Sequence, residues 1–424
     1  MKITYRKKTP LLILLAAAVG ILPYSNILCA FFLADDFDLL RGIAVEGPFS
    51  VLMAGSGGFF RPVVSLSFAL DILVWGLNPA GFHFFNVFLH FVNSLLVGYA
   101  TTLLLKASLR NTNAQATGWI SGLMFLAMPC HSEPVSWISG RMDLLAAFFA
   151  LVSLSCFLRF KKDSLTGWYA VSLVAFFLAL LSKESVVAYP AVMVIVIALI
   201  SLYERTKGRG HPFREAGGFF LVFGCYLVVR YCAIGTLLGG YGTHGNIDPW
   251  FIFKIVSRAP AKILVTLHGL KALGLDYWIT EVYAPIGIGL TLASAATVTV
   301  LGLQRHPRMS AFLTARLSPI AVVTCALATM FLISMAPVAN LPIPLGDLGN
   351  DRLLYWPSVF MAVFVAIVIQ AAVRSAGAVA MLVAVMVAGY GVSSYCLNEN
   401  WRLAGIISKN IVEDVNQLIS KDKN

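Results

Sequence analysis

The segment Leu11–Leu33, LLILLAAAVGILPYSNILCAFFL, decides the class of fold, because it contains no charged side chain. A helix that crosses a bilayer needs about 20 mostly apolar residues. The segment is too long for the core of a signal peptide and no small-residue cleavage site follows it, so we expect a retained transmembrane helix. Two adjacent acids, Asp35 and Asp36, come directly after it, where such a helix would leave the membrane.

The composition extends this prediction to the whole chain of 424 residues. Hydrophobic residues make up 59% and charged residues 12%, with a mean hydropathy of +0.82, which is typical of an integral membrane protein. The apolar runs predict an all-α polytopic protein with eleven spans, at residues 11–33, 82–105, 115–130, 142–160, 167–181, 186–203, 216–232, 284–303, 317–336, 353–373 and 376–396.

The basic residues predict the orientation of these spans. Lys2, Arg6, Lys7 and Lys8 precede the first span and place the N-terminus in the cytoplasm. With strict alternation, the cytoplasmic loops then hold more than half of the 31 Lys and Arg residues but only three of the 20 acids. The N-terminus is therefore predicted inside and the C-terminus outside, with most acids at the outer face.

Two long connections, 34–81 and 233–284, fall on the outer side. Each contains a helical stretch, Val63–Leu77 in the first and Phe251–Leu275 in the second, which we expect to lie on or in the outer leaflet rather than to span it. Residues 1–397 are predicted to form one transmembrane domain, and 398–424 a short helical tail outside the cytoplasm.

Two classes of function are disfavoured by composition and spacing. The net charge of +11 is dispersed over cytoplasmic loops and forms no basic patch, which disfavours nucleic-acid binding. The seven cysteines form no CxxC pair and lie mostly in apolar runs, so neither a disulfide framework nor a zinc site is predicted.

Asp35 and Asp36 are the first candidates for chemistry. Adjacent carboxylates repel one another, which raises the pKa of one and suits a proton acceptor. The alternative is that both acids only end a helix and face water. The pair could also hold a divalent cation such as Mg²⁺ or Mn²⁺, although no metal ligand is predicted with certainty.

Strict alternation brings charged residues from four separate loops, including the one with Asp35 and Asp36, to the same outer face. Cations together with a carboxylate suit a site that handles a phosphate and a proton. The cationic candidates for phosphate binding are Arg61, Arg141, Lys183 and Arg352. The candidates for contact with a substrate are His83, His131, Glu133, Asp143, Glu184 and Asp351.

Simpler interpretations stay open for several of these residues. Lys183 and Glu184 could lie in a solvated loop. His83, Asn86 and His90 share one helix face, a pattern typical of a metal site but more often of hydrogen bonds between helices. Asp71 lies in an amphipathic stretch and is expected to face the surface.

Several of these residues belong to motifs that resemble the transmembrane and tetratricopeptide-repeat O-mannosyltransferases and their bacterial relatives. The match runs in order along most of the chain. Its motifs are Phe60-Arg61-Pro62-Val63-Val64, Gly81-Phe82-His83-Phe84-Phe85-Asn86, His131-Ser132-Glu133-Pro134, Gly140-Arg141-Met142-Asp143, Leu181-Ser182-Lys183-Glu184, Asp351-Arg352-Leu353-Leu354 and Asn400-Trp401-Arg402.

The resemblance implies a glycosyltransferase of the C fold that uses a polyprenyl-phosphate sugar as donor. The family's acidic motif maps onto Asp35-Asp36, one of which would be the catalytic base. The sequence departs from the family at Met128-Pro129, where relatives have His-Pro, and it ends shortly after Trp401, where relatives continue into repeats. The acceptor therefore stays open between a protein, a glycan and a lipid.

The sequence thus predicts an inverting transferase in a bacterial-type inner membrane with its site facing outward, and it leaves open whether a divalent metal takes part. Two other classes stay open. A transporter or flippase for a lipid-linked sugar would use the same groove without a base, although no repeated halves are present. A non-catalytic binder of such a lipid would keep the fold alone.

Overall fold

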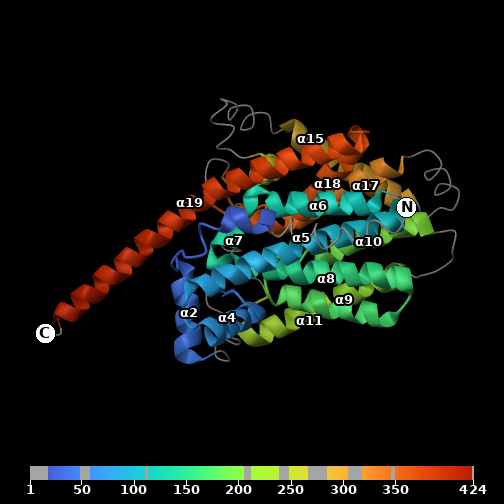
Figure 1. Ribbon diagram of the computed structural model, residues 1–424. Coiled ribbons are helices and arrows are strands. Elements are labelled where there is room, and N and C mark those ends of the chain that lie inside the picture. Colours follow the sequence, from blue (N-terminus) through green and yellow to red (C-terminus); the bar gives the residue numbers. More distant parts are fainter. Residues whose placement is uncertain are drawn as a thin grey trace.

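The computed structural model describes the chain in eight stretches, residues 18–47, 58–109, 113–204, 212–237, 248–265, 284–303, 318–344 and 349–422. These stretches contain helices and turns, and no strand occurs among them. Long helices lie side by side in one bundle, and the short helices α2 (Asp35–Glu46), α4 (Pro62–Trp75) and α7 (Ser132–Ser136) gather at one end of it (Figure 1). We call this end of the bundle the acidic end, because α2 begins with the acid pair.

The predicted spans after the first each coincide with a helix. These helices are α5 (Pro79–Leu109), α6 (Ala114–Ala127), α8 (Arg141–Asp163), α9 (Thr166–Leu180), α10 (Tyr189–Glu204), α11 (Pro212–Ile234), α15 (Ala284–Leu303), α17 (Pro319–Met335), α18 (Tyr355–Ala372) and α19 (Ala376–Asp422). Within the described stretches, six helices are long and apolar enough to cross a membrane. The chain is therefore an all-α membrane protein, while the count of eleven spans and their orientation stay predictions.

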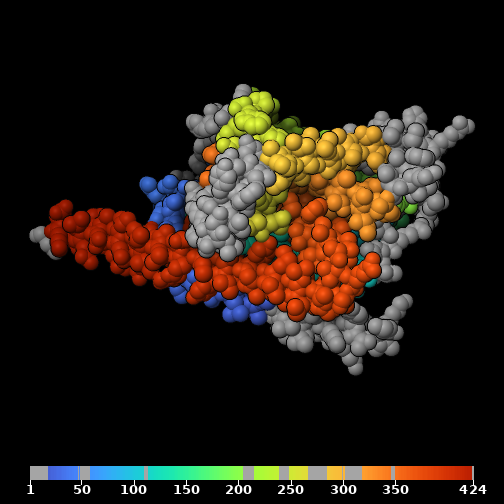
Figure 2. Space-filling view, turned by 90° about the horizontal axis from the view of Figure 1, so that it is seen from above, coloured from blue at the N-terminus to red at the C-terminus, as the bar shows by residue number. Residues whose placement is uncertain are grey.

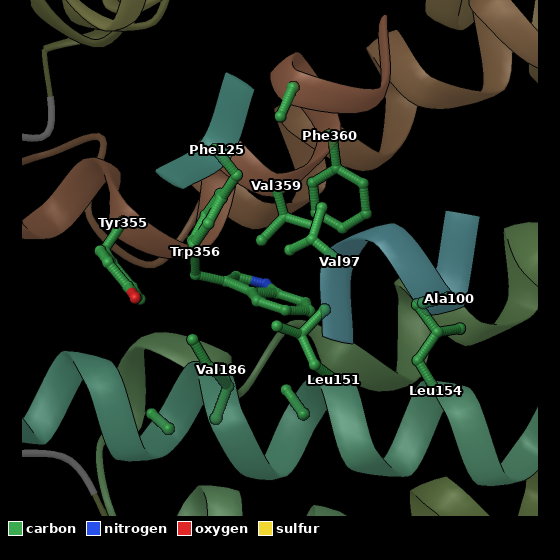
Figure 3. Close-up of a cluster of buried hydrophobic side chains, with 14 of the residues drawn as sticks. Val97, Ala100, Phe125, Leu151, Leu154, Val186, Tyr355, Trp356, Val359 and Phe360 are labelled. Atoms are coloured by element: carbon green, nitrogen blue, oxygen red, sulfur yellow. The ribbon is translucent and has the colours of Figure 1, made fainter. Parts of the chain in front are cut away.

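The centre of the bundle is formed by α5, α6, α8 and α18, which pack against one another. Glycines allow α5 and α6 to approach closely, since a Cβ atom on Gly118 would lie 2.5 Å from the carbonyl oxygen of Gly98. The indole of Trp356 on α18 fills the space beside Val97 of α5 and Leu151 of α8 (Figure 3). Close packing thereby fixes the positions of α5, α6, α8 and α18 relative to one another.

The prediction of one continuous helix through Leu33 is wrong. Its first residues, 11–17, lie outside the described stretches, but the helix that follows closes in the 3-10 turn η1 (Leu22–Tyr24). Residues 25–29 then form turns, and 30–33 are extended. Ser25 and Asn26 explain the ending, because the Ser25 hydroxyl donates back to the Leu22 carbonyl and the Asn26 amide donates to the Tyr395 carbonyl.

The predicted division at residue 398 stays a prediction, but it does not coincide with the end of a helix. The last span and the C-terminal tail are one helix of 47 residues, α19, which is about 70 Å long. Figures 1 and 2 show α19 lying along the bundle and then extending beyond it. No glycine or proline lies between Tyr395 and Asn400 to end the helix there.

The helical stretch of the first outer loop is oriented opposite to the prediction. Asp71 on α4 is buried, whereas Leu70, Leu73 and Val74 are exposed. From its polarity, Asp71 was expected to face water. The buried guanidinium of Arg141 pairs with Asp71, so the face of α4 that carries this acid is turned toward the protein interior. The helix α12 (Pro249–Leu264) accounts for the described part of the second stretch, and the remainder, including Lys271, lies outside the described residues.

Candidate active site

The acid pair is divided by the fold into one buried and one exposed carboxylate. Asp36 is 1% exposed, whereas Asp35 is exposed to solvent. One Asp36 oxygen accepts hydrogen bonds from the backbone N–H of Ser139 at 2.9 Å and from its hydroxyl at 2.5 Å. The other accepts from the Leu33 N–H at 2.9 Å. Asp36 therefore fastens the start of α2 to the loop before α8 and leaves Asp35 accessible.

The pKa of Asp36 is raised to about 6. Burial is the largest cause, because removal from water penalises the charged carboxylate. The hydrogen bonds from Ser139 and Leu33 lower the pKa in part, and the negative charge of Asp35 raises it further. The predicted rise in one pKa of the pair is thus found at Asp36, although burial and not mutual repulsion is its main cause.

Arg352 lies next to the loop that holds Asp36. Its guanidinium donates to Glu133 at 2.6 Å, its backbone N–H donates to the second Glu133 oxygen at 2.8 Å, and its carbon Cζ lies 4.8 Å from the centre of the Trp137 ring. The Trp137 indole N–H donates to the Leu33 carbonyl at 3.4 Å. Trp137 therefore connects the acid pair with the cation of Arg352.

Two further ion pairs fasten η5 (Glu184–Val186) and the residue before it to the acidic end. Arg61 binds both carboxylate oxygens of Glu184, one of them from Nε at 3.0 Å, and its guanidinium lies 4.2 Å from the Phe59 ring centre. Lys183 donates to both oxygens of Asp143 at 2.7 and 2.6 Å. Lys183 and Glu184 are therefore not the solvated pair that the simpler interpretation allowed.

Arg141 is the most enclosed of the predicted cations, with no exposed surface. It pairs with Asp71 at 2.5 Å and donates to the Asn86 side-chain oxygen at 2.8 Å and to the Phe82 carbonyl at 3.0 Å. Its guanidinium also lies 4.3 Å from the centre of the Phe68 ring. All of these groups belong to the protein, so Arg141 joins α4, α5 and α8 and presents no surface to a ligand.

The histidines predicted to contact substrate lie inside the bundle. His83 is hydrogen-bonded through Nε2 to the Ala30 carbonyl, and His90 to the Tyr355 hydroxyl and the Leu126 carbonyl. His131 is fully buried, and its Nε2 lies 2.8 Å from the Ser358 hydroxyl. The face of His83, Asn86 and His90 therefore makes hydrogen bonds between helices. No group of three potential metal ligands occurs among the described residues.

Lys262 and Asn398 were not among the predicted site residues. Lys262, on α12, is buried, pairs with Asp351 at 2.5 Å and also donates to the Pro344 carbonyl. The sequence showed that this stretch carries several basic residues, but it did not show which of them would be buried. Asn398, on α19, accepts from the hydroxyls of Ser132 and Ser136 and donates to the Pro23 carbonyl.

An apolar cavity lies beside α12, the helix that carries Lys262. Its volume is about 320 Å³, and it lies between α12, α15, α17 and α18. Pro260 and Leu264, on either side of Lys262 in the sequence, line it together with Leu290, Phe331 and Phe364. Figure 2 shows α15, in gold, beside α17, in orange. No charged side chain lines this cavity, which suits a hydrocarbon chain.

Several known proteins are similar to this chain in sequence. Protein O-mannosyl-transferase tmtc2 from Xenopus laevis is 33% identical over 276 residues, which cover 60% of this chain and 32% of that protein. Protein O-mannosyl-transferase TMTC2 from Homo sapiens is 30% identical over 202 residues, 43% of this chain and 23% of that protein. Drosophila melanogaster Tmtc1 is 31% identical over 134 residues, 32% of this chain and 15% of that protein.

The chain thus spans about a third or less of the length of these curated relatives. No protein-family model and no solved structure matches it. Human TMTC3 is similar as well, at 28% identity over 155 residues. The resemblance that the motifs indicated is confirmed by these relatives: the chain is similar in sequence to the protein O-mannosyl-transferases named TMTC1, TMTC2 and TMTC3.

Proposed function

We propose that this protein transfers one sugar, a hexose such as mannose, from a polyprenyl-phosphate carrier to the hydroxyl of an acceptor. The observation that carries the proposal is the division of the acid pair. Asp36 holds α2 against the loop of Trp137 and Ser139, which leaves the carboxylate of Asp35 exposed. Trp137 contacts both the Leu33 carbonyl, two residues before Asp35, and the guanidinium of Arg352. A base and a phosphate-binding cation are the two groups that such a transfer needs.

Asp35 is the residue to which we assign the role of base. It accepts the proton of the acceptor hydroxyl while the acceptor oxygen attacks the anomeric carbon. The bond between that carbon and the phosphate oxygen breaks, and the polyprenyl phosphate leaves with the bonding electrons. A single displacement of this kind inverts the anomeric centre. Asp36 positions Asp35 and does not contact the substrate.

The leaving phosphate gains negative charge as the bond breaks, so cations near it stabilise the transition state. Among the predicted cations, Arg352 and Arg61 have side chains that are 18% and 13% exposed and can reach a ligand. Arg141 and Lys183 are at most 1% exposed and already bind carboxylates. We therefore assign phosphate binding to Arg352 and Arg61, and a positioning role to Arg141 and Lys183.

The donor lipid would occupy the apolar cavity beside α12. That location keeps the isoprenoid chain out of water while its phosphate lies near the polar groups of the acidic end. Lys262, which is 4% exposed and already binds Asp351, has a positioning role like that of Arg141 and Lys183. Glu133 and Asp351 hold Arg352 and Lys262 in place before the donor binds.

The acidic end would face away from the cytoplasm, because the basic loops lie at the other end of the predicted spans. The relatives are named protein O-mannosyl-transferases, which makes a protein the first acceptor to test. A glycan or a lipid acceptor would use the same base. A bacterial inner membrane stays a prediction, since the relatives named above come from animals.

The experiment that tests the proposal uses purified protein in lipid with several polyprenyl-phosphate sugars. Asp35→Asn should lower turnover by about 10²- to 10⁴-fold, the usual contribution of a general base, while donor binding and folding persist. Asp38→Asn is the matched control, because Asp38 is an exposed acid in the first turn of the same helix. It should retain wild-type turnover.

Two other outcomes would reject the assignment. If donors bind but Asp35→Asn retains full turnover, Asp35 is not the base. If donors bind and no sugar is transferred by the wild type, a transporter, flippase or non-catalytic binder of the lipid-linked sugar replaces the enzyme.

A further inference from the structure

A second cavity, lined by described residues, does not belong to the candidate active site. Its volume is about 470 Å³, and it lies between one face of α5, one face of α6 and the last turns of α8. The helices α5 and α8 begin at the acidic end, at Pro79 and Arg141, and the cavity includes residues near their other ends, Lys106 and Arg159. We call it the α5–α6 groove.

The floor of the groove is made by glycines. Gly98, Gly118 and Gly122 line it, and their missing side chains allow α5 and α6 to approach closely. Apolar and aromatic side chains form the walls, with Tyr99 from α5 and Trp119 from α6 among them. Most of the exposed surface in the groove is thus apolar.

One end of the groove is basic. Lys106 from α5 and Arg159 and Lys162 from α8 meet there, next to the amide of Gln115. Asp163 is the acid that faces them, at 3.4 Å from Arg159 Nε and 3.9 Å from Lys162 Nζ. Three cations thus face one carboxylate, and the Lys162 side chain is 62% exposed. This end carries an excess of positive charge in reach of a ligand.

We propose that the α5–α6 groove binds an anionic phospholipid, with one acyl chain along the glycine floor and the phosphate at Lys106, Arg159 and Lys162. The argument is charge complementarity joined to polarity: a basic pocket between transmembrane helices, continuous with an apolar groove, matches a lipid with a negative head and a hydrocarbon tail. Tyr99 and Trp119 supply rings of the kind that favours the membrane interface.

The anionic phospholipid proposed for the α5–α6 groove would bind at a different place from the sugar donor. The donor phosphate belongs at the acidic end, whereas this headgroup lies where α8 ends, more than 20 residues away along that helix. Because α5 carries His83 and Asn86 near its first turns, the lipid would hold a helix that also shapes the active site. Lipid binding is independent of catalysis in this proposal.

The test measures lipid retention by native mass spectrometry after reconstitution into nanodiscs of phosphatidylcholine with added phosphatidylglycerol. The wild type should retain phosphatidylglycerol, and its thermal midpoint should rise with the anionic fraction. The triple variant Lys106→Gln, Arg159→Gln, Lys162→Gln should bind at least about tenfold more weakly. Arg374→Gln is the control, because Arg374 is an exposed cation that does not line the groove.

A second variant tests the apolar part of the groove without changing charge. Leu123→Trp places a larger side chain in the wall and should reduce retention of phosphatidylglycerol while Arg374→Gln does not. Equal retention by the wild type and the triple variant would overturn the proposal. So would equal retention of phosphatidylcholine, or selective retention of an added polyprenyl phosphate.

A further result would assign the groove to the chain itself. A photo-crosslinker at position 123 that reacts with residues 1–17 and with no lipid would show that the N-terminal segment fills the groove. Reaction with phosphatidylglycerol, weakened by the triple substitution, would support the lipid.

Discussion

The two ends of the bundle carry their charges in different ways. At the acidic end, ion pairs join segments that are far apart in sequence, such as Arg61 with Glu184 and Arg352 with Glu133, and at least one partner is mostly buried. At the opposite end, Arg159 and Lys162 meet Asp163 within one turn of the same helix, and all three are partly exposed. Lys161 is the exception there, because it pairs across helices with Glu215 of α11 at 3.1 Å. Long-range buried pairs fix the positions of loops, whereas local exposed pairs leave cations accessible.

This difference explains why the acidic end can serve as a site. A buried charge costs several kcal/mol to remove from water, so a pair is kept only where its geometry is satisfied by further hydrogen bonds. Lys183 meets this condition with two oxygens of Asp143 and Arg141 with three different partners. The loops before α8 and α10 are thereby held in place for Asp35 and Arg352.

The largest expected effect comes from breaking a buried pair at the acidic end. Arg141→Met leaves Asp71 charged and buried, and should lower the free energy of unfolding by about 3–5 kcal/mol. Arg41→Met is the control, because Arg41 is exposed on α2 at the same end. Thermal unfolding in detergent measures both. The double variant Arg141→Met with Asp71→Leu should recover part of the loss; no recovery would show that the pair itself is not the cause.

The next effect tests whether a partly exposed cation acts on the substrate. Arg352→Gln should lower kcat/KM by about 10- to 100-fold, which corresponds to the roughly 1.5–3 kcal/mol of a hydrogen bond to a charged group. Glu133 keeps the bond from the residue 352 N–H, so the thermal midpoint should change little. Arg402→Gln, in an exposed local pair, should keep full activity. A fall in stability equal to the fall in rate would mean that Arg352 only supports the fold.

The dependence of stability on pH sharpens the difference between Asp36 and its exposed neighbours. The pKa of Asp36 is raised to about 6 in the folded protein, against about 4 when unfolded, so the folded state binds the proton more tightly. Its contribution to stability is therefore present in full below pH 4 and is lost as the pH rises to 6, by roughly 2 kcal/mol.

Unfolding midpoints measured between pH 4 and pH 7 check this expectation. In Asp36→Asn that decrease should disappear, while Asp38→Asn should keep it. A stability that instead rises over this range by the same amount in wild type and Asp36→Asn would mean that Asp36 does not titrate there.

The smallest effect is expected on the part of α19 that extends beyond the bundle. Lys409 and Glu413 are four residues apart on this helix, 3.7 Å from each other, and both are more than half exposed. Lys409→Ala should therefore change the free energy of unfolding by no more than about 0.5 kcal/mol. Chemical denaturation measures it against the wild type, and a loss above 1 kcal/mol would reveal a contact of this part of the helix.

Much of the fold could be predicted from local pattern. Apolar runs of membrane length identified the helices from α5 to α19, because a span must satisfy its own backbone hydrogen bonds and keep its surface apolar. The ends were less predictable. The first span closes at Tyr24 and α19 continues past Asn398, and both outcomes depend on contacts between the two, such as Asn26 with Tyr395.

The sequence indicated which charged residues lie together in the candidate site, but not which of them are buried or which pairs they form. Strict alternation placed Asp36, Glu133, Lys183 and Arg352 at one face of the membrane, and the structure binds Arg352 to Glu133, Lys183 to Asp143 and Asp36 to Ser139. Nothing local distinguishes Asp35 from Asp36. The distinction comes from Ser139, a residue 103 positions further on, whose N–H and hydroxyl bind one carboxylate of the two.

By itself, therefore, the sequence determined that this is an all-α membrane protein and which charged residues gather at its acidic end. The reason is that the hydropathy of each segment decides whether it lies in lipid or in water, and the basic residues of the loops decide on which side of the membrane they lie. Only the tertiary structure decided which charges are buried, as it turned Asp71 and Lys262 inward and left Asp35 outside. A buried charge is stable only beside its partner, and partners such as Arg141 and Asp351 are brought to it by folding across the whole chain.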